Sequence, residues 1–261
     1  AMYADKKYRV RPLEEVMEDV DASARLWPRA RRVFVCDGDA LSAGYDTFSA
    51  LCEHIIRRFP ALERISAYTN ARDILRLSPE ELARLRELRF SLCYLGLESG
   101  GATVLERIRK GATPEDMAGM AEKARAAGMD LSAIVLLGAG GRALTEDHVT
   151  GTITVVNRMR PRYLSFLTAM IVPHTALMAW TREGAFQPLT DREILREARE
   201  MLAGLELDDT LFRMNHVSNL IALGGRLPRD RASLLAQLDA LIPRAGDRVT
   251  SICDGDQAMF L

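Results

Sequence analysis

The sequence is poor in cysteine, and its four cysteines lie far apart, at positions 36, 52, 93 and 253. None of them forms a CxxC pair, and this spacing argues against a zinc site or a local redox pair. A scattered cysteine usually behaves as a small buried hydrophobe. We therefore expect four buried, reduced thiols and no metal ligand among these residues.

The sequence also lacks a long apolar run and an excess of either charge. No apolar run approaches the roughly 18 residues that a membrane span requires, and no secretory signal pattern is present. The 35 basic and 36 acidic residues are closely mixed, which argues against broad nucleic-acid binding through phosphate contacts. We expect a cytoplasmic protein without a nucleic-acid or membrane partner.

Hydrophobic residues, by contrast, make up 48% of the 261 residues, enough for one large domain or for a barrel plus an extension. Apolar, β-branched runs predict six strands, and the first five begin at intervals of about 30 residues, the length of a βα unit. Such repetition implies a parallel sheet, either open or closed into a barrel. The predicted strands cover residues 31–36, 63–68, 91–97, 130–137, 162–171 and 210–214.

Helical patterns separate the predicted strands. Ser78 and Thr190 each begin a capping box, with a glutamate three residues further on, and therefore mark the starts of two helices. A last helix is predicted near residues 230–242. The alternation of strands and helices is typical of an α/β protein.

The N-terminal helix predicted over residues 12–26 has no strand before it. By the βα repeat, we expect its strand and loop to lie upstream of Ala1. The alternative is a free N-terminal helix that caps the floor of the barrel. We predict a barrel domain over residues 1–205, with its first βα element incomplete, and a C-terminal extension over 206–261 that packs on it.

A carboxylate and a hydroxyl follow the third predicted strand. The apolar run stops at Glu98 and Ser99, and Gly100 and Gly101 open a helix directly behind them. Parallel α/β proteins bind ligands at the carboxyl ends of their strands. Glu98 is therefore either a ligand contact or an anchor that hydrogen-bonds its own loop, and the sequence leaves both open.

Two other strand ends have glycine-containing turns. Gly38 lets the chain turn sharply after the first predicted strand, and Asp39 either accepts hydrogen bonds from an ammonium group or caps a helix. Gly138 opens a glycine-rich loop that lacks the GxGxxG and P-loop spacings. This loop either lets an adenine or methionine group lie on the backbone or is a plain tight turn.

The densest polar cluster outside the helix surfaces follows the sixth predicted strand and contains Arg213, Asn215, His216 and Asn219. A histidine titrates near neutral pH and serves as an acid or a base. A purely structural, hydrogen-bonding histidine fits the pattern as well. His54 and His148 lie in helical patterns, and we expect both on the solvated surface.

Taken together, these segments resemble the radical SAM superfamily, in particular stand-alone members related to the Elp3-like and oxygen-independent coproporphyrinogen oxidase groups. The resemblance extends to about residue 242, and the segment 96–100 with the later Lys110 and Gly111 is its most specific part. Residues 1–11 look like the sequence that follows a CxxxCxxC motif. The resemblance implies a partial (β/α)6 barrel without its first strand, and a [4Fe–4S] cluster held by three cysteines upstream of Ala1.

The resemblance also implies a role for each matching residue in binding S-adenosylmethionine. Gly38 and Asp39 match the turn that holds the amino group, and Glu98, assisted by Ser99, matches a contact to the ribose or methionine portion. Either Arg109 or Lys110 pairs with the carboxylate. Ser66 and Tyr68 line the same pocket, and the adenine contacts are Gly138, Ile171 and Val172. Residues 173–176 read Pro-His-Thr-Ala where relatives often show Pro-Gly-Thr-Pro.

The implied activity is reductive cleavage of S-adenosylmethionine to methionine and a 5′-deoxyadenosyl radical that abstracts hydrogen from an unknown small-molecule substrate. Asn215, His216 and Asn219 are the expected substrate contacts, and a flavodoxin or ferredoxin is the expected electron donor. A degenerate S-adenosylmethionine-binding protein without cluster chemistry is the main alternative. An ordinary aldolase or isomerase barrel fits less well, because no predicted strand ends in a lysine.

Overall fold

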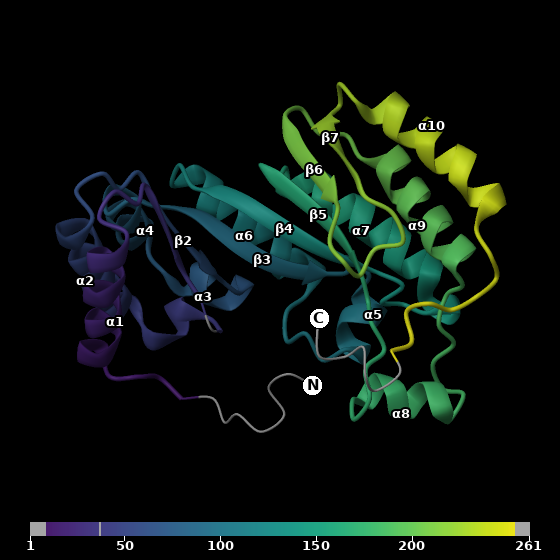
Figure 1. The fold of residues 1–261 in the computed structure, drawn as a ribbon, viewed down its shortest axis with the longest axis horizontal. Helices are drawn as coiled ribbons and strands as arrows, with labels where there is room; N and C mark the ends of the chain where they lie inside the picture. Colours follow the sequence, from purple (N-terminus) through teal and green to yellow (C-terminus); the bar gives the residue numbers. More distant parts are fainter. Residues whose placement is uncertain (1–8, 37, 254–261) are drawn as a thin grey trace. The chain divides into compact units, whose positions relative to one another are not determined.

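The computed structural model of the chain describes residues 9–36 and 38–253 (Figure 1). The described chain divides into two compact units, which we describe separately. The N-terminal unit contains the chain as far as Leu95 and also Gly119–Ser132, and the C-terminal unit contains Gly96–Ala118 and the chain from Ala133 onward.

The N-terminal unit contains three parallel strands with helices between them. Strand β2 pairs with β1 on one side and with the first part of β3 on the other. Its strands are β1 (Arg32–Val35), β2 (Arg64–Tyr68) and the first part of β3 (Phe90–Glu98), and its helices are α1 (Leu13–Leu26), α2 (Tyr45–Arg58), α3 (Ala71–Arg76), α4 (Pro79–Glu87) and the short η1 (Ala40–Ala43).

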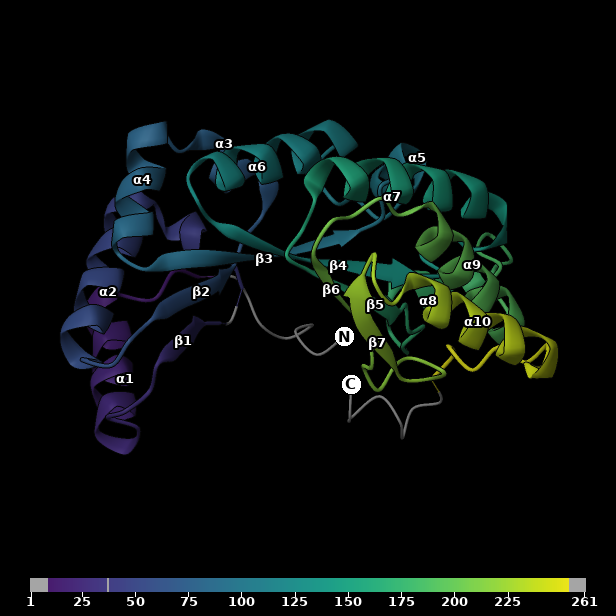
Figure 2. The ribbon, with the colours of Figure 1, turned by 90° about the horizontal axis from the view of Figure 1, so that it is seen from above.

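One face of these three strands is buried under helices. Phe48, Leu51 and Ile55 recur on one side of α2 and are buried, while Ile65 and Ala67 of β2 are fully buried on the covered face of the strands. Figure 2 shows the helices of this unit along one side of its strands. The alternate side chains of β1 and β2 therefore lie on a face without helices.

The C-terminal unit contains the end of β3, β4 (Asp130–Leu137), whose first residues lie in the N-terminal unit, and three further strands. Strand β5 pairs with β6 in parallel, and β6 pairs with β7 in antiparallel fashion. The further strands are β5 (Tyr163–Thr168), β6 (Thr210–Met214) and β7 (Leu223–Leu227), and the helices are α5 (Ala102–Arg107), α6 (Pro114–Ala126, shared with the N-terminal unit), η2 (Arg142–Leu144), α7 (Thr145–Met159), α8 (Ala176–Arg182), α9 (Asp191–Gly204), α10 (Arg231–Leu241) and η3 (Ile242–Arg244).

Helix α10 and its preceding turn cover one face of β6 and β7. Phe212 and Met214 are buried on that face, and Gly225 of β7 approaches Asp230 and Leu234 so closely that a Cβ there would lie 2.9 Å from the Cβ of Asp230. Arg213 and Asn215 alternate with the buried residues and are exposed on the opposite face.

The strand order confirms the predicted fold class. The seven strands are hydrogen-bonded in the order β1-β2-β3-β4-β5-β6-β7, so the described sheet is open rather than closed into a barrel. All six predicted strands are present, and both predicted capping boxes form at Ser78 and Thr190. Strand β7 was not predicted. The boundary expected at residue 205 stays a prediction. Within the described ranges, no helix combines the length and apolar character needed to cross a bilayer.

Candidate functional site

Two carboxyl groups meet behind the turn that follows β1. Gly38 has a φ of 96°, and Asp39 directly precedes η1. The Asn70 side-chain amide donates a hydrogen bond to one oxygen of Asp39, while the other, Oδ1, is buried and has no hydrogen-bond partner. Oδ2 of Asp73, on helix α3, is also buried without a partner.

This pair has the electrostatics of a site for a cation. Burial raises the pKa of Asp39, and together with hydrogen bonding to and repulsion by the neighbouring Asp73 carboxyl it brings that pKa to about 7. When both acids are ionised, Oδ1 of Asp39 and Oδ2 of Asp73 are acceptors without a donor, which is costly in a buried position. An ammonium group would supply the missing donors and lower the repulsion. Asp73, just 8% exposed, was missed by the sequence reasoning.

The other predicted residues of this unit lie near an aromatic cluster. Tyr68 forms edge-to-face contacts with Phe34 and Tyr94, with centroid separations of 5.0 Å from Phe34 and 6.2 Å from Tyr94. Tyr68 is 44% exposed and Phe34 38% exposed, whereas Ser66, on the same face, is 3% exposed. Tyr68 therefore offers a ligand its ring and hydroxyl, and Ser66 offers little accessible surface.

Glu98 and Lys110 are brought together at the end of β3. Nζ of Lys110 donates to Oε1 of Glu98 across 3.0 Å, and both side chains are about one quarter exposed. Glu98 has a φ of 60°, in the left-handed region that non-glycine residues rarely adopt. Arg109, which also has a positive φ of 54°, is exposed. Lys110, not Arg109, is thus the basic residue placed beside Glu98.

Ser99, by contrast, faces the interior. It is fully buried, its Oγ accepts a hydrogen bond from the backbone of Gly101, and the same Oγ lies 2.7 Å from Nδ1 of His148. On the other side of the imidazole, Nε2 lies 3.5 Å from Oε1 of Glu197, which accepts a hydrogen bond from the backbone of Gly138. The network joins the end of β3 to the end of β4 through helices α7 and α9.

Burial keeps both titratable members of this network neutral near pH 7. It lowers the pKa of His148 to about 4 and raises the pKa of Glu197 to about 8. Their 3.5 Å contact is therefore not an ion pair at neutral pH. The expectation that His148 lies on the surface was wrong, and His54 also lies inward, with its side chain 16% exposed and hydrogen-bonded to Asp21.

Gly138, Ile171 and Val172, the residues matched to adenine contacts, each pack against or hydrogen-bond to other parts of the chain. Gly138 has a φ of 78°, and a Cβ there would lie 2.8 Å from Ile194, so the close approach of α9 explains the glycine. Ile171 is buried in a small cluster with Met178 and Phe186. The carbonyl of Val172 accepts a hydrogen bond from Thr175, ahead of α8.

The predicted substrate contacts differ in accessibility. The amide of Asn219 is engaged with β5, donating to the carbonyl of Phe166 and accepting from Thr168. His216 is exposed, and its Nδ1 is hydrogen-bonded locally by Ser218. Asn215 is exposed and lines a groove beside Arg213. Asn215 and His216 are therefore exposed, whereas Asn219 is engaged with β5.

The described residues contain no metal centre. No group of three or more histidine, cysteine or acidic side chains within the described ranges has the arrangement of a metal site. Cys52, Cys93 and Cys253 are buried as expected, whereas Cys36 is exposed, contrary to the prediction. Burial raises the pKa of Cys52 and Cys93 to about 12, which makes them poor ligands. A cluster does not fit these residues, and residues 1–8 lie outside the described chain.

Comparison with known protein families decides the relationship. The family described as the Radical SAM superfamily matches residues 2–155, more than half of the chain. The chain belongs to the radical SAM superfamily. Members of the superfamily generally use a [4Fe–4S] cluster and S-adenosylmethionine. A comparison with curated proteins found no significant match.

Solved radical SAM structures share the fold at low sequence identity. Coproporphyrinogen III oxidase (HemN) from Escherichia coli, a radical SAM enzyme, is 15% identical with a TM-score of 0.57, over 73% of this chain and 45% of its own. Elp3 from Methanocaldococcus infernus, with an N-terminal deletion, is 12% identical with a TM-score of 0.57, over 89% and 59%. Methylornithine synthase (PylB) is 15% identical with a TM-score of 0.53, over 77% and 55%. The chain thus spans about half the length of these radical SAM proteins.

Proposed function

We propose that this chain binds S-adenosylmethionine as part of a radical SAM enzyme that acts on a small-molecule substrate. In such an enzyme a bound [4Fe–4S] cluster would supply the one-electron reduction that cleaves S-adenosylmethionine for hydrogen abstraction from the substrate. Membership of the superfamily supports this proposal. We place the cluster ligands on a CxxxCxxC segment upstream of Ala1, and we expect a flavodoxin or ferredoxin to supply the electron.

The observation that carries the proposal is the unsatisfied carboxyl pair behind the first strand. Asp39 and Asp73 each keep a buried oxygen without a hydrogen-bond partner. We propose that the amino group of S-adenosylmethionine donates to Asp39 there. Binding would replace a protonated or repelling pair of acids with a charge-assisted hydrogen bond, which is about twice as strong as a neutral one.

In the C-terminal unit, Glu98 and Lys110 are the residues that we propose to contact polar groups of a ligand. The Glu98 carboxylate is held at a strand end by Lys110, and its remaining oxygen is an acceptor for ribose hydroxyls. Lys110 balances the charge of Glu98. We give Ser99 an indirect role, because its hydroxyl already joins Gly101 to His148. Gly138 likewise acts through the position of its backbone.

The activity is tested with the full-length gene product, reconstituted anaerobically with iron and sulfide and supplied with dithionite and S-adenosylmethionine. Formation of 5′-deoxyadenosine above a cluster-free control is the expected result. Binding of S-adenosylmethionine without cleavage would instead favour a binding protein without cluster chemistry. Absence of both binding and cleavage would overturn the proposal.

The role of Asp39 is tested by comparing two ligands. Methylthioadenosine shares the adenosine and sulfur of S-adenosylmethionine but lacks the α-amino group of its methionine portion. We expect Asp39→Asn to weaken S-adenosylmethionine binding by about tenfold or more, the order expected from a charge-assisted hydrogen bond, and to leave methylthioadenosine binding unchanged. Asp46→Asn, the same substitution at an exposed position of α2, is the matched control. Equal losses for both ligands would contradict the assignment.

A further inference from the structure

Arg213 is an exposed arginine in the middle of β6. Among the described residues, its guanidinium has no hydrogen-bond or ion-pair partner. It lies on the face of β6 opposite to that covered by α10, because its neighbours Phe212 and Met214 are buried toward the helix. An arginine carries its charge at any physiological pH and presents five N–H donors in a planar fork.

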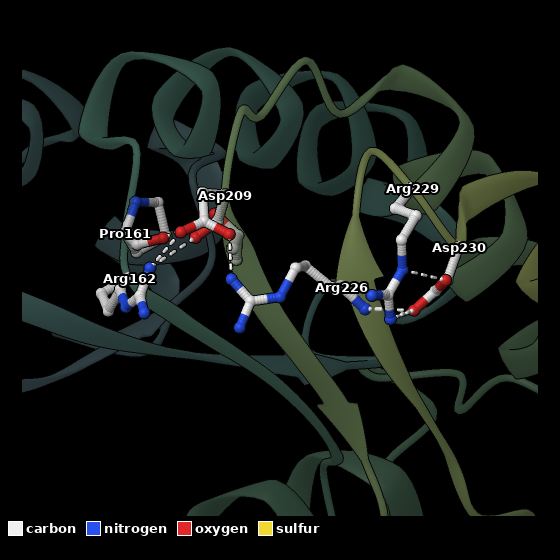
Figure 3. Close-up of polar contacts among 7 residues, drawn as sticks. Pro161, Arg162, Asp209, Arg226, Arg229 and Asp230 are labelled. Atoms are coloured by element: carbon white, nitrogen blue, oxygen red, sulfur yellow. Dashed lines mark hydrogen bonds and ion pairs between the residues drawn. The ribbon is translucent and has the colours of Figure 1, made fainter.

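The arginines around it are already paired. Arg226 of β7 forms an ion pair with Asp209, and Arg162 pairs with the same carboxylate (Figure 3). Arg229 donates to Asp230, 2.8 Å away (Figure 3). Asp209 is shared by Arg162 and Arg226, and Asp230 pairs with Arg229, so these residues keep a net positive charge. Arg213 adds to that charge a guanidinium that has no counter-ion among the described residues.

Space for a ligand is present beside Arg213. A groove of about 540 Å³ runs along β6 and β7, lined among others by Leu211, Arg213, Asn215 and Arg226. Gly224 stands opposite Arg213 in the antiparallel register, and a Cβ there would meet the carbonyl oxygen of Phe212 at 3.4 Å and no other atom within 4 Å. The absence of a side chain at Gly224 therefore keeps the space beside Arg213 free.

Neutral hydrogen-bonding groups flank the guanidinium. Ser165 of β5 is the parallel-register partner of Arg213 and lies on the same face. Asn215, two residues further along β6, also lines the groove. A guanidinium between a hydroxyl and an amide suits a planar anion, which it binds through two parallel hydrogen bonds.

We propose that this groove binds a carboxylate group of the substrate, with Arg213 as the residue that pairs with it. The proposal rests on the proposed function, since it supplies a substrate class, carboxylate-bearing small molecules, for that enzyme. We assign a carboxylate because its two coplanar oxygens match two parallel N–H donors of one guanidinium, and the phosphate titration below tests the doubly charged alternative. Leu211 and Ala222 supply apolar contact for the rest of the molecule.

The test measures anion binding directly, so that it does not depend on radical chemistry. The arginine side-chain Nε–Hε signals of the ¹⁵N-labelled protein are followed by NMR during titration with sodium benzoate. Sodium phosphate and sodium chloride at equal ionic strength are titrated in parallel. Arg213→Gln assigns the Arg213 signal, and Arg196→Gln removes an equal charge from an exposed position on α9 as a matched control.

We expect benzoate to shift the Arg213 signal in a saturable way and to bind at least about tenfold more weakly to Arg213→Gln, consistent with the loss of a charged hydrogen bond. Arg196→Gln should bind benzoate like the unmodified chain. A shift that follows chloride, or an equal loss in both variants, would overturn the anion site. Phosphate saturating at lower concentration than benzoate would overturn the carboxylate assignment. Because S-adenosylmethionine is absent, either result leaves 5′-deoxyadenosine formation as a separate test of the enzyme.

Discussion

Glu98 and Lys110 form a 3.0 Å ion pair in the space beside Gly96, which has no side chain. A Cβ at position 96 would lie 2.3 Å from Oε1 of Glu98 and 3.2 Å from Nζ of Lys110. The position of the Glu98 side chain therefore explains why residue 96 is a glycine. The φ of Gly96 does not lie in the left-handed region, so its backbone conformation does not require glycine. The close approach of the Glu98 and Lys110 side chains does.

Substituting Gly96 with alanine is expected to displace the Glu98 carboxylate and to lower S-adenosylmethionine binding. The effect on stability should be small, because the atoms that the new Cβ meets are the ends of two flexible side chains. The measurement is urea unfolding together with binding. Gly119→Ala is the control, because its new Cβ would meet just one atom outside its own helix, at 3.8 Å, and alanine favours helices by up to about 1 kcal/mol. Unchanged S-adenosylmethionine binding in Gly96→Ala would refute the steric argument.

Asp39 should make the chain less stable as pH rises. Burial and Asp73 raise its folded pKa to about 7, above the unfolded value near 3.9. Between these values the folded state binds more protons, so the free energy of unfolding falls with pH. Asp39→Asn should remove this slope between about pH 4 and 7. Unfolding measured across that range in both proteins tests it, and parallel pH profiles would disprove the raised pKa.

His148 should act in the opposite direction. Burial lowers its folded pKa to about 4, below the unfolded value near 6.5, so the unfolded state binds more protons between these values. Its contribution is complete above pH 6.5 and is lost as pH falls toward 4. The change is on the order of 3 kcal/mol. Relative to His148→Asn, the unmodified chain should lose stability over this range, and titration of His148 near pH 6.5 by NMR would contradict the prediction.

Glu197 is predicted to tolerate glutamine better than alanine. Glutamine keeps an oxygen for the backbone N–H of Gly138 and removes the ionisation that burial opposes. Since the folded pKa is about 8, Glu197→Gln should be the more stable protein above that pH. Glu197→Ala leaves the Gly138 donor buried without a partner and should lose about 1 to 3 kcal/mol. Thermal unfolding at pH 6 and pH 9 separates these outcomes, and equal effects of the two substitutions would argue against the hydrogen bond.

The strand positions were predictable because local patterns set them. Six apolar runs gave strands whose starts lie within one residue of those predicted, since burial beneath helices requires a continuous apolar sequence. Strand β7 was not predicted, because Gly224 and Gly225 interrupt its apolar pattern and glycine has a low strand propensity. Its pairing with β6, and the close approach of Asp230 to Gly225, place it in the sheet.

The sequence indicated candidate site residues but not the partners of their side chains. Sequence reasoning selected Asp39 and Glu98 at strand ends, and the family resemblance added Lys110. It placed His148 on the surface because the partners that bury it, Ser99 and Glu197, are 49 residues away on either side. It overlooked Asp73 for the same reason, since the proximity of Asp73 to Asp39 depends on the packing of α3 beside the first strand end.

Because the backbone at Glu98 is left-handed, stability and ligand binding favour different residues at this position. A non-glycine residue with a φ of 60° costs roughly 1 kcal/mol relative to glycine, so a library randomised at this position and sorted for thermal resistance should enrich glycine. The same library sorted for retention of S-adenosylmethionine should enrich glutamate. The two selections would then favour different residues at position 98. The difference in stability between the glycine and glutamate variants would measure how much stability the chain loses by carrying a carboxylate there.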